Sequence, residues 1–102
     1  MMDKERDRRW SKAVNKKYAG KCPHCNKKAV GGIHHIIPRN ELKTRYLITN
    51  GIATCNELHR MFEGNQVQRD YAISRYVSWK RFYILESIAS GLVANKKFEE
   101  VK

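Results

Sequence analysis

Hydrophobic positions near the start of the chain recur at helical spacing. Trp10, Val14 and Tyr18 are four residues apart in a segment that is otherwise polar and basic. One apolar stripe with this period is typical of a helix that packs one face on a core. We therefore predict a helix over residues 1–19, and Gly20 is a stop signal for it.

The second half of the chain shows the same helical spacing. It predicts a short helix over residues 55–64 and a longer helix over residues 68–90, with Gly91 as its C-terminal cap. The last eight residues, 95–102, are mostly polar, and we expect them to be frayed. The wide apolar stripe of the longer helix consists of Ala72, Ile73, Tyr76, Val77, Tyr83, Ile84 and Ile88.

The middle of the chain has the signals of strands rather than helices. Residues 29–39, AVGGIHHIIPR, are rich in β-branched side chains and bounded by Gly and Pro, which predicts a short hairpin. Residues 40–54 are read mostly as loop, with a turn at Asn50–Gly51. Because neighbouring side chains of a strand point to opposite faces, His34 and His35 should face in opposite directions.

Length and charge narrow the class of protein. A chain of 102 residues with no repeat and no linker predicts a single α+β domain over residues 1–102 with a modest core. Its formal net charge of +11 favours a polyanionic partner, above all nucleic acid. We find no apolar run long enough for a bilayer and no signal-peptide pattern, so we expect no membrane association. The odd number of cysteines argues against a fully paired secreted framework, so we expect a cytoplasmic location.

The three cysteines have the spacing of metal ligands. Cys22 and Cys25 form a C-x2-C pair, and Cys55 follows further along the chain, which suggests one tetrahedral structural zinc site. Leu58 stands where a fourth cysteine ligand would be expected. Of the nearby histidines, His59 is a better candidate for the fourth ligand than His24, which lies inside the C-x2-C turn. The alternative is that these are free cysteines that pack as small apolar residues.

The histidines suggest a second site. An imidazole from the strand, His34, and one from the following helix, His59, can hold a divalent ion between the two elements. His35, on the other face of the strand, could then accept a proton from water. Glu63 lies one helical turn after His59, either as a further metal ligand or as a solvated charge at the helix end.

The order and spacing of three stretches, HHIIPR, TNGIATC and LHRMF, resemble the HNH endonucleases of bacteria and phages. The resemblance covers about residues 10–63. It implies a ββα-metal fold, in which a hairpin packs on one helix around a divalent ion. Helices would flank this core on both sides, with a C-terminal helical extension over about residues 66–92.

The resemblance also implies a role for individual residues. His34 and His59 would ligate the catalytic metal, with Glu63 as a third candidate ligand. His35 would activate the attacking water. The side-chain amide of Asn50 would orient the His35 imidazole. The implied reaction is hydrolysis of a DNA phosphodiester bond, with Mg²⁺ or Mn²⁺, or else Zn²⁺ or Ni²⁺, as the catalytic ion.

Double-stranded DNA is the partner that this activity and the charge imply. Several basic side chains are suited to contacts with the phosphate backbone rather than with bases: Arg8, Arg9, Lys12, Lys16, Lys17, Arg39 and Arg60. Further expectations are a homodimer, or a place in a phage packaging or restriction assembly. The aromatic residues Trp79 and Phe82 are assigned to the core, with a dimer contact as the alternative.

A non-catalytic function is the main alternative. In it Cys22, Cys25, Cys55 and His59 form one Cys₃His zinc site, and the module only binds nucleic acid. This interpretation supplies the missing fourth ligand, but it leaves the histidine pair and Asn50 without a role.

Overall fold

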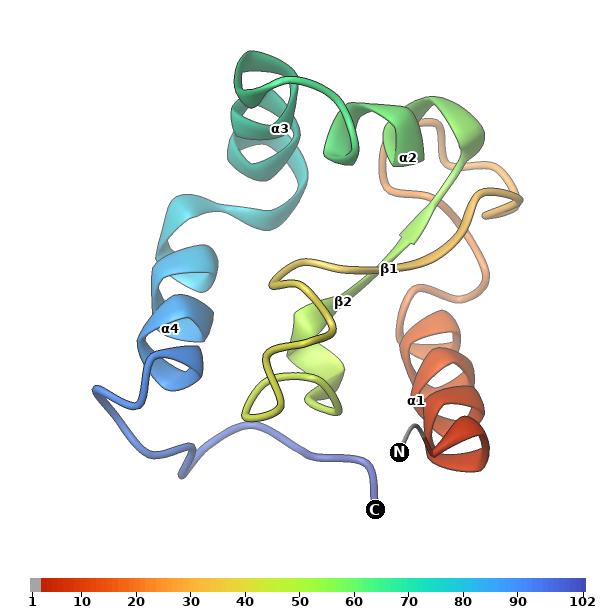
Figure 1. Ribbon diagram of the computed structural model, residues 1–102. Helices are drawn as coiled ribbons and strands as arrows, with labels where there is room; N and C mark the ends of the chain where they lie inside the picture. Colours follow the sequence, from red (N-terminus) through yellow and green to blue (C-terminus); the bar gives the residue numbers. More distant parts are fainter. Residues whose placement is uncertain (1–2) are drawn as a thin grey trace.

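An antiparallel two-stranded hairpin lies at the centre of the fold, between one helix and three others (Figure 1). The computed structural model describes residues 3–102. Its elements are α1 (Lys4–Lys17), β1 (Gly32–His35), β2 (Gly51–Thr54), α2 (Asn56–Phe62), α3 (Gln66–Ala72) and α4 (Trp79–Ala89). The α+β class predicted from the sequence is therefore confirmed.

The first helix forms where the apolar spacing predicts it, although residues 1 and 2 lie outside the described part of the chain. Asp3 caps its start, because its side chain accepts a hydrogen bond from the backbone of Arg6 at 2.9 Å. Trp10 and Val14 are its buried residues. The indole of Trp10 donates to the carbonyl of Leu47 at 2.8 Å, and this bond attaches α1 to the loop that precedes β2.

The predicted hairpin within residues 29–39 is wrong, because β1 pairs with a strand much further along the chain. Its partner β2 lies in the segment 40–54, which was predicted to be mostly loop. All four residues of β2 are buried. A strand buried on both faces has no alternation of polar and apolar positions, so its signal in the sequence is weak.

The register of the two strands sets the direction of each histidine. His34 lies opposite Ile52, and His35 lies opposite Gly51. The turn predicted at Asn50–Gly51 is also wrong. Instead, Asn50 ends a short 3₁₀ helix and Gly51 is the first residue of β2.

The long helix predicted over residues 68–90 is interrupted. A π-helical turn, Ile73–Val77, follows α3, and Ser78 then takes a left-handed backbone conformation with φ of 86°. The Ser78 hydroxyl accepts a hydrogen bond from the backbone of Arg81 at 3.2 Å and so starts α4 as a new helix. The predicted cap is confirmed at Gly91, which has φ of +82°.

The C-terminal residues are not frayed as predicted but pair with the loop before β2. The backbone of Ile48 donates to Glu99 at 3.0 Å, and that of Val101 donates to Tyr46 at 2.9 Å. The guanidinium of Arg6 also donates to the carbonyl of Val101 at 2.8 Å. The tail thereby holds the start of α1 against this loop, so α1 begins close to the C-terminal residues (Figure 1).

Two hydrophobic clusters lie on the two faces of the hairpin. The smaller one contains Trp10, Val14 and Tyr46, with Ile33 of β1 packed against it. The main core contains buried residues of β2 and of the helices that follow it: Ile52, Leu58, Phe62, Ala72, Leu85 and Ile88. Trp79 and Phe82 are partly buried against this main core, in agreement with the core role predicted for them.

We predict that Gly51→Ala destabilises the fold by about 1–3 kcal/mol, since overpacking a filled core has a cost of this order. A methyl group at this position would meet Val14 and lie 2.8 Å from Cζ2 of Trp10. Urea unfolding measures the loss. The double variant Gly51→Ala/Val14→Ala should lose less stability than the sum of its two single variants, and simple additivity would contradict this packing account.

Candidate functional site

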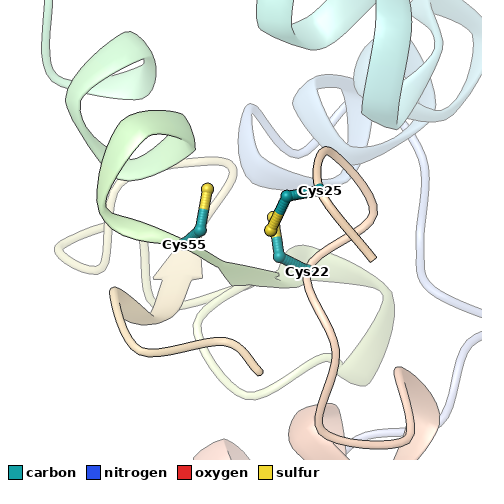
Figure 2. Close-up of side chains that lie close together, drawn as sticks. All are labelled: Cys22, Cys25 and Cys55. Atoms are coloured by element: carbon teal, nitrogen blue, oxygen red, sulfur yellow. The ribbon is translucent and has the colours of Figure 1, made fainter. Parts of the chain in front are cut away.

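A tight turn holds the first two cysteines. The backbone of Asn26 donates to the carbonyl of Cys22 at 2.7 Å, and the backbone of Cys22 donates to Lys27 at 2.8 Å. Asn26 adopts φ of 57°, a left-handed conformation that asparagine tolerates better than most residues. The backbone of His24 points at the Cys22 sulfur, 3.3 Å away. This turn places Cys22 and Cys25 side by side (Figure 2).

The third cysteine reaches the same place from the end of β2. The backbone of Gly31 donates to Thr54 at 2.8 Å, and a Cβ at Gly31 would lie 2.5 Å from the Cys55 carbonyl, so only glycine fits here. Cys55 caps α2, and its sulfur accepts a hydrogen bond from the backbone of Leu58 at 3.4 Å. All three sulfur atoms lie within 4.8 Å of one another (Figure 2).

Three converging thiols can hold a metal ion, and thiolate ligands suit zinc. In residues 3–102 no histidine or carboxylate joins this cluster. Leu58 is buried and apolar, while His24 contacts the Tyr76 hydroxyl at 2.5 Å and Glu57 at 3.3 Å. The described residues therefore supply three of the four ligands of a tetrahedral ion.

The structure does not place His59 at the thiols, so the Cys₃His ligand set is corrected. Nε2 of His59 lies 2.7 Å from the Glu63 carboxylate, one helical turn away. Its ring lies edge-on to that of His34, with centroids 5.6 Å apart. His34 in turn stacks on Phe62, with centroids 4.9 Å apart. The rings of His34 and His59 thus lie next to each other between β1 and α2.

The other histidine of the pair has a separate environment. The His35 ring stacks on Trp10 of α1, with centroids 3.9 Å apart and planes at 7°. Its Nε2 lies 3.1 Å from the carbonyl of Arg45. Since a carbonyl can only accept, Nε2 carries the hydrogen and Nδ1 keeps its lone pair. Arg45 is itself held by Asp7 of α1, with two nitrogen–oxygen distances of 2.9 and 3.0 Å to the carboxylate.

Burial keeps both histidines of β1 neutral at neutral pH. Desolvation, and after it the neighbouring His59, lowers the pKa of His34 to about 4. Desolvation also lowers the pKa of His35 to about 4, partly offset by its hydrogen bond to the Arg45 carbonyl. Neutral imidazoles have the lone pairs that metal ligation and proton abstraction both require.

A hollow of about 490 Å³ opens beside these residues and is named the histidine hollow below. It is lined by His34, His35, His59 and Glu63, together with two arginines, Arg39 and Arg69. Arg69 was not among the predicted site residues. Its place at the hollow follows from the packing of α3 and has no signal in the local sequence.

One ring nitrogen of His59, which lines the hollow, lacks a hydrogen-bond partner. Nδ1 of His59 is buried without a hydrogen-bond partner, and buried polar atoms are almost always satisfied in native proteins. A metal ion or water would satisfy it. His34, His59 and Glu63 do not converge as the thiols do, so within the described residues no compact three-ligand set forms here. The donor chemistry fits a divalent ion bound by imidazoles, with other positions open.

Asn50 acts at a different place from the one predicted. Its side chain does not hold the His35 imidazole; Oδ1 accepts from the backbone of Ile37 at 2.8 Å, and Nδ2 donates to the Ile37 carbonyl at 3.2 Å. Asn50 is fully buried. The amide thus fixes the backbone two residues after His35, so any effect on the imidazole passes through the strand.

The predicted DNA-contacting residues are spread over two regions. Arg39 lines the histidine hollow. On α1, Arg8 and Arg9 both pair with Glu5, and Arg9 also donates to the carbonyl of Lys102 at 2.6 Å. The remaining predicted contacts are all exposed: Lys12, Lys16, Lys17 and Arg60.

Comparisons with protein-family models, with curated proteins and with solved structures give no significant match. Within residues 3–102 no helix is both long and apolar enough to cross a membrane.

We predict that the three thiols of the metal-free protein bind one Co²⁺ with the absorption of a tetrahedral thiolate site. Cys22→Ser should weaken binding at least about tenfold, because a lost ligand should cost no less than a lost ligand-orienting contact. His59→Ala is the matched control and should leave this site unchanged. Thiolate-to-cobalt absorption that is insensitive to Cys22→Ser, or lowered by His59→Ala, would contradict the assignment.

Acid should destabilise the metal-free protein through the histidines of β1. The folded-state pKa values of about 4 lie below the usual 6.5, so the unfolded state binds more protons between these values. The contribution is complete above about pH 6.5 and is lost as the pH falls toward 4. The variant His35→Phe keeps the stack on Trp10. Between pH 7 and pH 4.5 its free energy of unfolding should fall by roughly 1–3 kcal/mol less than that of wild type. Urea unfolding in EDTA at pH 7 and pH 4.5 checks this, and equal losses in both proteins would refute it.

Proposed function

We propose that this protein is a metal-dependent endonuclease of the HNH type that hydrolyses DNA phosphodiester bonds. The observation that carries the proposal is that two adjacent neutral histidines line one hollow but have different neighbours. His34 faces the imidazole of His59, whereas His35 is held by a carbonyl and an indole. The order β1, β2, α2 also supports the proposal, because a hairpin followed by a helix is the order of the ββα-metal core.

His35 is the proposed general base. Its Nε2–H donates to Arg45, so Nδ1 is available to take a proton from water. Stacking on Trp10 restricts rotation of the ring. The link from Arg45 to Asp7 anchors the carbonyl partner to α1. The base is thereby held in one tautomer and one orientation, as general-base catalysis requires.

His34 and His59 are the proposed ligands of the catalytic ion. When bound, a divalent cation neutralises charge on the phosphate and on the leaving oxygen. Glu63 pairs with Nε2 of His59 and so can orient this imidazole, as carboxylates do for many metal-bound histidines. This assigns Glu63 to positioning, with direct ligation as the alternative that a rotation of its side chain would allow.

The charge distribution supports DNA as the substrate. A net charge of +11 attracts a polyanion, and Arg39 brings a permanent positive charge to the histidine hollow. Exposed basic residues of α1 add contacts that position a phosphate backbone without reading sequence. We therefore propose duplex DNA as substrate, bound with little base specificity.

The three-cysteine cluster favours a second candidate function, a nucleic-acid-binding module stabilised by metal. In this version the ion at Cys22, Cys25 and Cys55 has a structural role only, and the hollow binds no second ion. The two candidates share the thiol site and the basic surface. They differ in whether His35 is needed for activity.

We predict that supercoiled plasmid is cut in Mg²⁺ or Mn²⁺ and that His35→Ala lowers the rate by about 10²–10⁴-fold, the usual contribution of a general base. DNA binding by this variant should stay within about threefold of wild type, since His35 is neutral and adds no charge. Gel assays of cleavage and anisotropy measurements of binding check both points. Equal cutting by the two proteins would refute the role of His35. Absence of cutting by wild type with metal bound would favour the binding module.

A further inference from the structure

A second hollow adjoins the histidine hollow and shares one wall with it. It has a volume of about 380 Å³ and reaches toward Phe82 and Glu86 of α4. Ile36, Pro38 and Arg69 line both hollows. Arg69 is the charged residue of this shared wall. A DNA strand bound in the histidine hollow would pass the Arg69 guanidinium if it continued into the second hollow.

Arg69 also differs from the other arginines of the chain in its surroundings. It is half-buried on α3, and within residues 3–102 its side chain has no hydrogen bond or ion pair. Arg60 and Arg75 likewise have no such partner there, but both are exposed. Arg69 borders both hollows and has no partner among the described residues, so its guanidinium is placed to pair with an anion that binds there.

We propose that Arg69 binds the DNA phosphate next to the scissile phosphate. This inference rests on the proposed function, which puts the reacting phosphate at His34 and His59. A guanidinium can donate two parallel hydrogen bonds to one phosphate, which fixes the strand as well as attracting it.

The carboxylates of the second hollow define how far the phosphate backbone extends. Glu41 and Glu86 line that hollow beyond Arg69 and repel further phosphates. Arg69 therefore lies where the lining changes from the histidine hollow, with Arg39 and Glu63, to the two carboxylates of the second hollow. The strand should turn away from the protein at this point, and Arg69 acts as a positioning residue for the phosphate before the turn.

The test compares Arg69→Gln with Arg75→Gln, a matched loss of one charge on an exposed arginine six residues away. DNA affinity is measured in the His35→Ala background over a range of salt concentrations. Arg69→Gln should weaken binding about tenfold and reduce the slope of log K against log salt by about 0.9, the value for one lost phosphate contact. Arg75→Gln should change affinity less than about twofold and leave the slope unchanged.

Cleavage kinetics supply the second readout. Because the contact is made equally in the bound state and in the transition state, Arg69→Gln should raise KM about tenfold and leave kcat within about threefold. A fall in kcat of the same size instead would place Arg69 on the reacting phosphate and overturn the proposal. Equal effects of the glutamine variants at 69 and 75 on DNA binding would also overturn it.

The two proposals fail in different ways. Without cleavage by wild type the nuclease assignment falls, but the binding measurement still decides whether Arg69 contacts a phosphate. Circular dichroism confirms that each variant is folded. If Arg69→Gln unfolds, Arg69→Met retains the apolar stem and is tested by the same salt slope, with the same loss expected and an unchanged slope as the contrary result.

Discussion

The buried side-chain amide of Asn50, the residue before β2, binds the backbone of the chain just after the end of β1. Its side chain exchanges two hydrogen bonds with the backbone of Ile37, and its own carbonyl accepts from Ile36 at 2.9 Å. These bonds continue the pairing of the strands past the end of β1. Since a slip of one residue would move every side chain to the opposite face, this closure decides which way His34 and His35 point.

The hairpin then acts as a partition between two environments. On one face Gly51, opposite His35, leaves the space that Val14 and Trp10 of α1 fill. On the other face α2 brings its own imidazole toward His34. The far end of the hairpin carries Cys55, where the two other thiols meet it. A metal ion there would fasten the cysteine turn to the end of β2 and the start of α2, which stiffens the helix that carries His59.

The parts of this fold that sequence predicts are those with local causes. The stripe of Trp10 and Val14 specifies α1, and Gly91 ends α4 because glycine accepts a left-handed conformation. Strand β2 was missed because all of its residues are buried. The break at Ser78 follows from tertiary packing, since serine in a helical pattern gives no strong stop signal. Likewise, the special surroundings of Arg69 depend on how α3 packs against α2.

The chemistry of the histidine hollow depends on which of its charges can change with pH. Burial keeps His34 and His35 neutral down to about pH 4, so their lone pairs are available throughout the physiological range. The positive charge that an incoming phosphate meets comes from the guanidinium groups of Arg39 and Arg69. Attraction of DNA and abstraction of a proton are thus assigned to different side chains. A protonated His35 could attract phosphate, but it would have no lone pair with which to accept a proton from water. Because the guanidinium groups supply the positive charge, the buried imidazole can stay neutral and act as the base.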